Sequence, residues 1–218
     1  MSSDTPGNWV GNSAEHYFAE KPDVRSEPKQ IQAQVRWLKL AFTTDRGVFS
    51  REKVDRGSRM LIETAQASDR DEILDLGCGW GVVGIVAART WPDAKVTMVD
   101  INERACDLTR ANAAANDVGQ VEIVCGDAVE ALADRSFDTI LCNPPVSAGR
   151  AVVVRLMDYA AGHLKPGGAF WMVAATRKGA KSLAKRLEER FVHVVEAELG
   201  SGFRVYKATE PIQGGTEQ

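Results

Sequence analysis

The sequence predicts a doubly wound α/β fold with seven mostly parallel strands, an antiparallel last strand and a short N-terminal β-hairpin. Three observations support this prediction. From residue 72 onward, short apolar runs alternate with segments of helical periodicity, which is typical of βαβ units. A glycine-rich turn, Gly77-Cys78-Gly79-Trp80-Gly81, joins the first of these strands to its helix. Two extended runs flank Gly200-Ser201-Gly202, so the last strand should run antiparallel to its neighbours.

The composition indicates one globular domain. The chain has 218 residues, 44% of them apolar and 26% charged, which is sufficient for a core. No apolar run approaches the roughly 18 residues that span a bilayer, and the polar N-terminus lacks the apolar core of a signal sequence. Four scattered cysteines without a C-x-x-C pair indicate reduced thiols. We therefore expect a cytoplasmic protein without a membrane span or a bound metal.

The N-terminal part is expected to differ from the rest of the chain. Residues 1–20 should form a flexible lead-in, and residues 21–67 an extension made of a β-hairpin and a helix. Alternating apolar and polar residues over 30–45 predict the two strands of the hairpin, with Trp37 in the core. Helical spacing of apolar residues predicts a helix over 58–67.

Residues 68–210 are expected to form the core domain, followed by a tail over 211–218. The predicted strands of this domain span, in order, residues 73–76, 96–100, 121–125, 137–142, 169–174, 193–199 and 203–208. The predicted helices span residues 82–90, 103–116, 150–163 and 180–190. Because strands and helices alternate, helices should cover both faces of the sheet.

The glycines Gly77, Gly79 and Gly81 predict a nucleotide-binding loop. Glycine tolerates positive φ angles and lets a ligand approach the free N–H groups of a helix N-terminus. In doubly wound sheets, ligands bind at the carboxyl ends of the strands near the switch point. The segment also fits G-x-G-x-x-G, and Asp100 ends the next strand at a suitable distance. An NAD-dependent oxidoreductase is therefore one interpretation of the loop.

Three carboxylates at the ends of consecutive strands favour a different ligand. Asp75 and Trp80 would crowd a pyrophosphate, whereas a sulfonium cofactor carries positive charge and no phosphate. In this interpretation Asp100 binds the ribose hydroxyls, and Asp127 binds the adenine amino group. Each aspartate alone is also compatible with a helix N-cap.

The segment Asn143-Pro144-Pro145 predicts the chemistry. It follows the apolar run 137–142, and its two prolines end that strand because neither can donate to a ladder. The Asn143 side-chain oxygen and the Pro144 carbonyl then offer acceptors for a planar NH2 group. Accepting both N–H bonds would orient the nitrogen lone pair and stabilise positive charge on the nitrogen. The pattern indicates methyl transfer from a nucleoside cofactor to an amino nitrogen.

In order and spacing, these motifs resemble those of class I S-adenosylmethionine-dependent methyltransferases. Three further segments are similar to the methyltransferase small domain family: Glu15-His16-Tyr17-Phe18, Asp45-Arg46-Gly47-Val48-Phe49-Ser50 and Val54-Asp55-Arg56-Gly57-Ser58. The resemblance implies a Rossmann-like methyltransferase sheet, S-adenosyl-L-methionine as cofactor, and guanine N2 of small-subunit ribosomal RNA as acceptor. It makes Asn143, Pro144 and Pro145 the catalytic residues. The cofactor would contact Asp75, Gly77, Gly79, Gly81, Asp100, Ile101, Asp127, Ala128, Asn143 and Phe49.

The charge distribution points to RNA as the carrier of the acceptor. The net charge is −3, yet residues 21–59 carry ten Lys or Arg against five Asp or Glu. Residues 176–190 carry six against two. Local positive charge of this kind is typical of nucleic-acid binding, although a solvated helix face would also explain the second stretch. The expected substrate contacts are Arg36, Lys39, Arg46, Arg51, Lys53 and Val146.

Two features leave the acceptor open. Many relatives that methylate planar amines have an aromatic residue after Asn-Pro-Pro, where this chain has Val146. Some relatives that modify ribosomal RNA carry two copies of the domain, and this chain has one. Adenine N6 and a protein glutamine N5 are therefore alternative acceptors, and a non-catalytic binding module is an alternative class. The resemblance also implies that segment 47–50 covers the site, with Phe49 against an adenine or a target base. We expect a monomer or a homodimer.

Overall fold

The computed structural model describes residues 24–212, and its central feature is a seven-stranded sheet. The strands are β3 (Glu72–Leu76), β4 (Lys95–Asp100), β5 (Val121–Cys125), β6 (Phe137–Cys142), β7 (Leu164–Ala175), β8 (Phe191–Gly200) and β9 (Phe203–Pro211). They lie in the order β5-β4-β3-β6-β7-β9-β8. The pairs from β5 to β7 are parallel, and β9 is antiparallel to both β7 and β8. The predicted doubly wound fold with an antiparallel last strand is confirmed.

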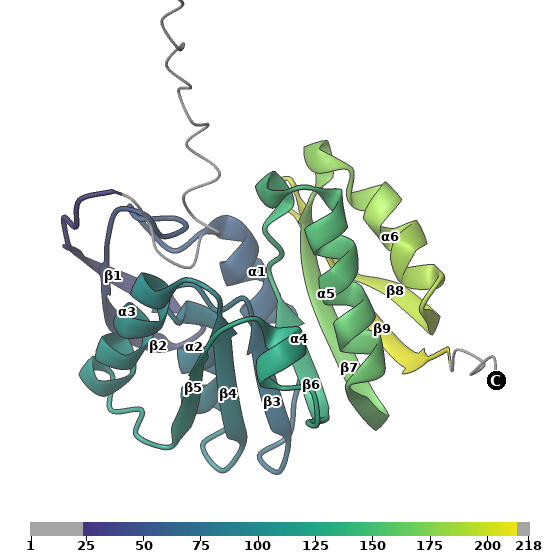
Figure 1. The fold of residues 1–218 in the computed structure, drawn as a ribbon, viewed down its shortest axis with the longest axis horizontal. Helices are drawn as coiled ribbons and strands as arrows, with labels where there is room; N and C mark the ends of the chain where they lie inside the picture. Colours follow the sequence, from purple (N-terminus) through teal and green to yellow (C-terminus); the bar gives the residue numbers. More distant parts are fainter. Residues whose placement is uncertain (1–23, 213–218) are drawn as a thin grey trace, which may run out of the picture.

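Helices cover both faces of this sheet (Figure 1). The first face carries α1 (Arg56–Thr64), α2 (Val82–Thr90) and α3 (Glu103–Ala115), and the second carries α4 (Ala128–Ala131), α5 (Arg150–Gly162) and α6 (Ala180–Glu188). Neighbouring residues of a strand point to opposite faces, so Ile73 packs in the first core and Leu74 in the second. The two hydrophobic cores hold the parallel strands from both sides.

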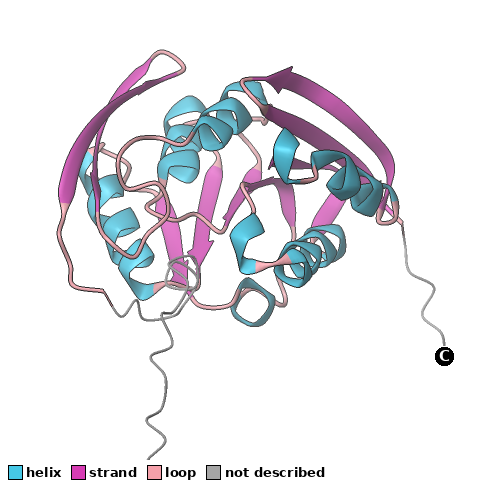
Figure 2. Ribbon diagram, turned by 90° about the horizontal axis from the view of Figure 1, so that it is seen from above, coloured by secondary structure: helices cyan, strands magenta, loops and turns pink. Residues whose placement is uncertain are grey.

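The predicted hairpin is formed by β1 (Lys29–Val35) and β2 (Leu38–Thr44), which make a separate sheet beside α3 (Figure 2). Two buried asparagines, Asn112 in α3 and Asn116 directly after it, hold it there. The Asn112 amide accepts from the Thr43 N–H at 2.7 Å and donates to the Thr43 carbonyl at 2.9 Å. Asn116 makes the same two bonds with Ala41, at 3.1 and 2.7 Å. The two side chains thus supply β2 with the partners that another strand would give it.

This arrangement predicts a large stability effect for Asn112→Ala. The substitution leaves the partly buried N–H and carbonyl of Thr43 without the Asn112 amide, and each such loss costs about 1–3 kcal/mol. We expect the free energy of unfolding to fall by about 3 kcal/mol in urea denaturation. The matched control is Gln120→Ala at an exposed position just beyond α3, with an expected change within about 0.5 kcal/mol. Equal values for the two variants would contradict the role of Asn112.

The first helix is shifted towards the N-terminus relative to the predicted span 58–67. α1 begins at Arg56 because Asp55 accepts a backbone N–H of the first turn at 3.1 Å and caps it. It ends early because the Arg36 guanidinium donates to the carbonyl oxygens of Ile62 and Ala65, both at 2.8 Å. A cation from a distant hairpin therefore sets the end of this helix, which local periodicity does not reveal.

One side chain and two secondary-structure elements also differ from the prediction. Trp37 is 66% exposed and not part of the core, because it lies in the turn between β1 and β2. The short helix α4 was not predicted; Asp127 caps it. β7 is longer than the predicted 169–174 because it begins at Leu164, and its pairing with β6 shifts register near Phe137.

Some expectations concern parts of the chain outside residues 24–212, namely the lead-in, the segment with His16 and the end of the tail. Within residues 24–212, no helix combines the length and apolar character needed to cross a bilayer. No three His, Cys, Asp or Glu side chains of that range gather as a metal site, and the four cysteines are free thiols. The division between extension and core at residue 67 stays a prediction.

Candidate active site

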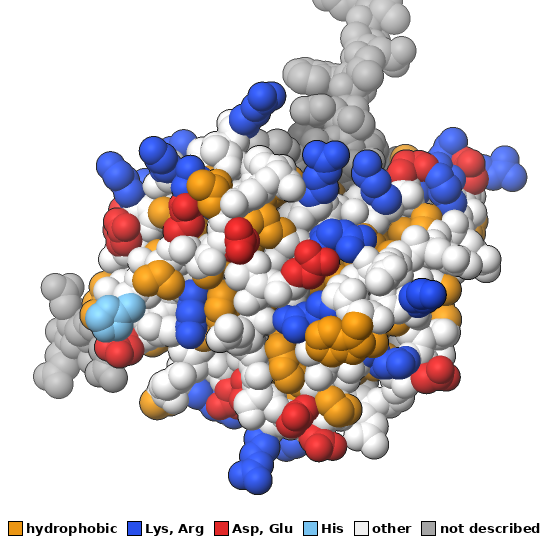
Figure 3. Space-filling model, turned by 180° about the vertical axis from the view of Figure 1, so that it is seen from behind, with side chains coloured by type: hydrophobic (Ala, Val, Ile, Leu, Met, Phe, Trp, Pro, Cys, Tyr) orange, Lys and Arg blue, Asp and Glu red, His pale blue; other side chains and the backbone are white. Residues whose placement is uncertain are grey.

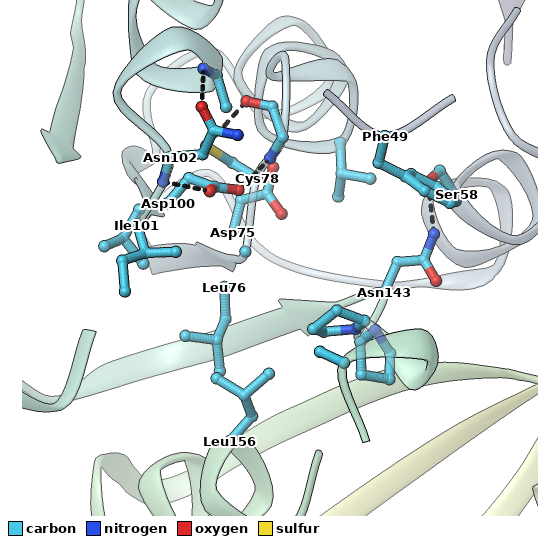
Figure 4. Close-up of a pocket in the computed structure, with 18 of the residues that line it drawn as sticks. Phe49, Ser58, Asp75, Leu76, Cys78, Asp100, Ile101, Asn102, Asn143 and Leu156 are labelled. Carbon is cyan, nitrogen blue, oxygen red and sulfur yellow. Dashed lines mark hydrogen bonds between the residues drawn. The ribbon is translucent and has the colours of Figure 1, made fainter. Parts of the chain in front are cut away.

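A cavity of about 450 Å³ opens at the carboxyl ends of β3 and β6 (Figure 4). These strands are neighbours at the point where the strand order reverses, and Asp75 is in register with Leu141. The glycine loop after β3 therefore lies next to Asn143, which follows β6. Segment 48–50 and the first turns of α5 complete the lining. Doubly wound sheets bind their ligands at this position.

The three predicted glycines shape the loop in two different ways. Gly77, Gly79 and Gly81 have φ angles of 78°, 57° and 92°. A Cβ atom added to Gly77 or Gly79 would meet nothing within 4 Å, so these two face open space along the cavity. A Cβ at Gly81 would lie 2.8 Å from the Thr109 side chain. The first two glycines leave room for a ligand, and the third permits close packing of α3.

Two carboxylates hold the loop and line the cavity. Asp100 accepts hydrogen bonds from the N–H groups of Gly79 at 2.8 Å and Asn102 at 2.9 Å. Asp75 accepts from the Gly84 N–H at 2.8 Å. Burial raises the pKa of both carboxyl groups, and that of Asp75 rises to about 7. Carboxylates removed from water in this way favour a ligand that brings positive charge or hydrogen-bond donors.

Asp127 lies at the end of β5 and lines the same cavity, together with Ile101 and Ala128. One of its oxygens accepts from the Val129 N–H at 2.9 Å and caps α4. The other forms an ion pair with Arg155 at 2.6 Å. The N-cap interpretation of Asp127 is therefore correct, and its contact with an adenine amino group stays a prediction. No sequence pattern singled out Arg155, which also lines the cavity.

The orientation of the Asn143 amide follows from its partners on α1. Its nitrogen donates to the Asp55 carboxylate at 3.1 Å and to the Ser58 hydroxyl oxygen at 2.8 Å. A carboxylate only accepts, so the NH2 side of the amide must face Asp55. Asn143 Oδ1 is turned away from these partners, as Figure 4 shows. The role of this oxygen as the acceptor for an amino group stays a prediction.

The two prolines end β6 at Cys142, as predicted, and begin a tight turn. The Pro144 carbonyl accepts from the Val146 N–H at 2.8 Å around Pro145, whose φ and ψ are −75° and 75°. These angles are those of an inverse γ-turn. The Pro144 carbonyl is thus not entirely free, because one of its two lone pairs is used within the turn. Val146 lines the cavity and begins the 3₁₀-helix η2 (Val146–Ala148).

Segment 47–50 is fixed to the body of the protein at three points. The Gly47 carbonyl accepts from the Asn102 amide at 2.9 Å, and Val48 is buried in the first core. The Phe49 carbonyl accepts from the Trp80 indole N–H at 2.8 Å. The Trp80 ring is itself buried and packs edge-on against Phe42. Trp80 therefore anchors the segment, and the argument that its ring would crowd a pyrophosphate is wrong.

The cations expected to contact a substrate lie outside the cavity lining: Arg36, Lys39, Arg46, Arg51 and Lys53. Arg36 donates to the end of α1 and packs over the Trp91 ring at 5.2 Å, and its contact with a phosphate stays a prediction. Arg46 and Arg51 pair with Glu27 at 2.6 and 3.1 Å. Lys39 and Lys53 are exposed. A role for the last four in binding RNA stays a prediction.

The residues at the cavity fit a positively charged nucleoside. Gly77 and Gly79 leave an open backbone cradle, and the buried Asp75 and the half-buried Asp100 place acceptors beside it. Apolar side chains, among them Ile101, line the same part of the cavity and suit a flat ring. This combination matches a cofactor with a cationic centre, a ribose and an adenine.

Comparison with known proteins gives the family. Residues 39–207 match the family model described as the methyltransferase small domain. The chain belongs to this family. Membership confirms the predicted resemblance and the methyltransferase class, with S-adenosyl-L-methionine as cofactor. It also decides against the NAD-dependent oxidoreductase.

Three relatives of this methyltransferase small domain protein are informative. Protein YbxB of Bacillus subtilis (strain 168), described as uncharacterized, is 38% identical over 197 residues, which cover 89% of this chain and 98% of YbxB. Ribosomal RNA small subunit methyltransferase C of Pseudomonas syringae pv. syringae (strain B728a) is 34% identical, over 87% of this chain and 56% of that protein. A solved T. thermophilus 16S rRNA N2 G1207 methyltransferase, in complex with AdoMet and guanosine, has a TM-score of 0.75 and 26% identity. The match covers 87% of this chain and 52% of that one, so this chain spans about half the length of these two methyltransferases.

Sequence reasoning missed the partners that orient Asn143 in this methyltransferase. Asp55 and Ser58 lie in the segment that carries the resemblance, but they precede Asn143 by 88 and 85 residues. Asp55 directly precedes α1 and Ser58 lies in its first turn, so the local polarity indicates only a helix cap. The contact depends on α1 packing across the sheet edge, which is a tertiary feature.

The raised pKa of Asp75 predicts pH-dependent binding of cofactor by the methyltransferase. If the ionised carboxylate binds the cofactor's ammonium group, affinity for S-adenosylhomocysteine should increase about tenfold between pH 6 and pH 8, because the pKa is about 7. Calorimetric titration at several pH values measures this change. The Asp75→Asn variant keeps the volume and an acceptor for Gly84, and its affinity should lack this component.

A stability measurement supplies the control for Asp75. The native state binds this proton more tightly than the unfolded chain does, so the Asp75 contribution lowers the free energy of unfolding as the pH rises from 4 to 7. Asp75→Asn should therefore be more stable than wild type at pH 8 and similar to it near pH 4. An unchanged pH dependence of binding in a stable variant would contradict the role of Asp75.

Proposed function

We propose that this protein transfers a methyl group from S-adenosylmethionine to an exocyclic amino nitrogen of RNA, specifically guanine N2 of ribosomal RNA. The observation that carries the proposal is the fixed Asn143 amide. Its NH2 side is held by Asp55 and Ser58, so its oxygen is available to an incoming amino group. The names of the relatives agree: the T. thermophilus methyltransferase acts on guanine N2 of 16S rRNA.

The acceptor is the difficult partner in this reaction, because the lone pair of an exocyclic amine is delocalised into the base. When bound, S-adenosylmethionine supplies an electrophilic methyl group. Asn143 Oδ1 and the remaining lone pair of the Pro144 carbonyl accept the two N–H bonds and turn the nitrogen lone pair out of the ring plane. Positioning of this kind can contribute roughly 7–11 kcal/mol. The same acceptors stabilise positive charge that develops on nitrogen.

Proton removal needs no dedicated base in this site. No histidine is among the described residues that line the cavity. An alkylated amino nitrogen is strongly acidic, so water suffices as the proton acceptor. The Asp100 carboxylate accepts from the Gly79 N–H of the cofactor loop, and the buried Asp75 accepts from the Gly84 N–H of α2. We therefore assign them to cofactor binding.

The surface charge supports an RNA substrate. Lys and Arg side chains gather along the edge of the molecule at which the parallel strands end (Figure 3). This edge also carries the mouth of the cavity. Cations around a concave site supply phosphate contacts that do not depend on sequence. A base within RNA must leave its stack to enter such a cavity.

Methyl transfer to RNA and to protein separates the proposed acceptor from glutamine N5. Purified protein is incubated with tritiated S-adenosylmethionine and either total RNA or protein extract from cells lacking the gene. We expect label in RNA, and mass spectrometry of digested nucleosides should identify N2-methylguanosine. If the digest contains N6-methyladenosine instead, the acceptor is adenine and not guanine. Label confined to protein would overturn the RNA substrate.

A further inference from the structure

Phe49 is a large apolar side chain that the fold keeps exposed. It is 47% exposed and lines the cavity, although the neighbouring Val48 is buried. Its backbone is not free to withdraw the ring, because its carbonyl is bonded to the Trp80 indole. The next residue, Ser50, has a φ of 55°, which is unfavourable for residues other than glycine. A ring held in this way offers an apolar face to whatever enters the cavity.

The position of Phe49 separates it from the loop that fits the cofactor. In Figure 4, Phe49 lies on the side of the cavity that carries Ser58 and Asn143, apart from Asp100 and Ile101. Ser58 holds Asn143 on this side, where the proposed function places the acceptor of the amino group. The ring therefore faces the space in which an acceptor group would lie.

The other aromatic residues of the cavity do not offer a free face there. Trp80 is buried against Phe42. The Phe203 ring packs on the first turn of α1, where a Cβ at Gly57 would approach it to 3.1 Å. Residue 146, directly after the Asn-Pro-Pro segment, is a valine and provides no ring. Phe49 is thus the ring among the described lining residues that is both exposed and near Asn143.

We propose that Phe49 is the stacking platform for the acceptor, and that the acceptor is therefore a planar nucleobase and not an amide side chain. This inference deepens the proposed function and rests on it for the identity of the acceptor side. Unpaired bases bind proteins by stacking on aromatic rings while their edges form hydrogen bonds. A platform on segment 47–50 would support the face of the base while Asn143 holds its amino group. Stacking selects planarity and not one base, so the edge contacts decide between guanine and adenine.

The test measures equilibrium binding of guanosine and of adenosine to protein saturated with S-adenosylhomocysteine. Phe49→Leu keeps an apolar side chain but loses the ring, and we expect about tenfold weaker binding of both nucleosides. Phe49→Tyr restores the ring and should bind like wild type. The matched control is Trp37→Leu, which removes an exposed ring at the tip of the hairpin and should change nothing. Affinity for S-adenosylhomocysteine should stay within about twofold in all variants.

The outcomes separate this inference from the proposed function. Nucleoside binding that is absent in wild type, or unchanged in Phe49→Leu, would overturn the platform. A loss of S-adenosylhomocysteine affinity in Phe49→Leu, with nucleoside binding unchanged, would make Phe49 a cofactor contact, as the sequence suggested. A third outcome is that nucleoside binding depends on Phe49 but the protein methylates no RNA. This outcome would support the platform and reject only the proposed RNA methylation.

Discussion

Asn143→Ala is expected to lose methyl transfer about 100- to 1,000-fold while it still binds S-adenosylhomocysteine. The loss is comparable to removal of one preorganised hydrogen-bonding group that acts on developing charge. The cofactor loop and its carboxylates lie on other elements, so cofactor affinity should change by less than about threefold. Single-turnover transfer to RNA and calorimetry measure the two quantities separately.

Two related variants test the orientation of this amide. Asn143→Asp keeps an oxygen near Oδ1 but places the second oxygen against the Asp55 carboxylate, and we expect a loss similar to that of Asn143→Ala. Ser58→Ala removes one of the two bonds to the amide nitrogen and should cost about tenfold in rate. Wild-type rates in Asn143→Ala would reject the mechanism. A fully active Asn143→Asp would show that only an oxygen at this position is required.

Asp100→Ala is expected to weaken binding of S-adenosylhomocysteine about 100-fold. The substitution removes a half-buried, charged group that we expect to accept from the ribose hydroxyls, and such hydrogen bonds contribute about 1.5–3 kcal/mol. It also frees the N–H groups of Gly79 and Asn102, so the glycine loop loses its shape. Calorimetric titration well below the unfolding temperature measures the affinity.

Asp107→Ala is the matched control for Asp100. Asp107 lies on α3 with its side chain 79% exposed, and its pair with Arg110 is a surface contact. We expect unchanged cofactor affinity and stability. An Asp100→Ala affinity within about threefold of wild type would show that the cofactor does not use this carboxylate. Asp100→Asn, which retains the volume of the side chain, separates loss of charge from collapse of the loop.

The fold was predictable because its signals are local and regular. The apolar runs that became β3, β4 and β6 alternate with helical periods, and the glycines mark the loop between β3 and α2. The sequence predicts less accurately those features that depend on contacts with distant parts of the chain. α1 ends where Arg36 reaches it from the hairpin, and Trp37 is exposed because it lies in a turn.

The sequence predicts which residues lie at the candidate site better than it predicts the contacts between them. The sequence singles out Asp75, Asp100 and Asn143 because each ends a strand, and strands that run in parallel bring their ends together. The contacts between Asn143 and α1, and between Asp127 and Arg155, join segments far apart in the chain. Such contacts depend on how helices pack on the sheet, and no local pattern encodes them.

Trp80 belongs to the glycine loop, and its indole N–H donates to the carbonyl of Phe49, which lies on a different segment of the cavity lining. An adjustment of the loop around a bound methyl donor would therefore move the Phe49 ring as well. Two sites joined in this way influence each other's affinity, and the free energy of coupling is equal in both directions. If Phe49 is the platform for the acceptor, this one hydrogen bond would make recognition of the acceptor depend on the presence of the donor.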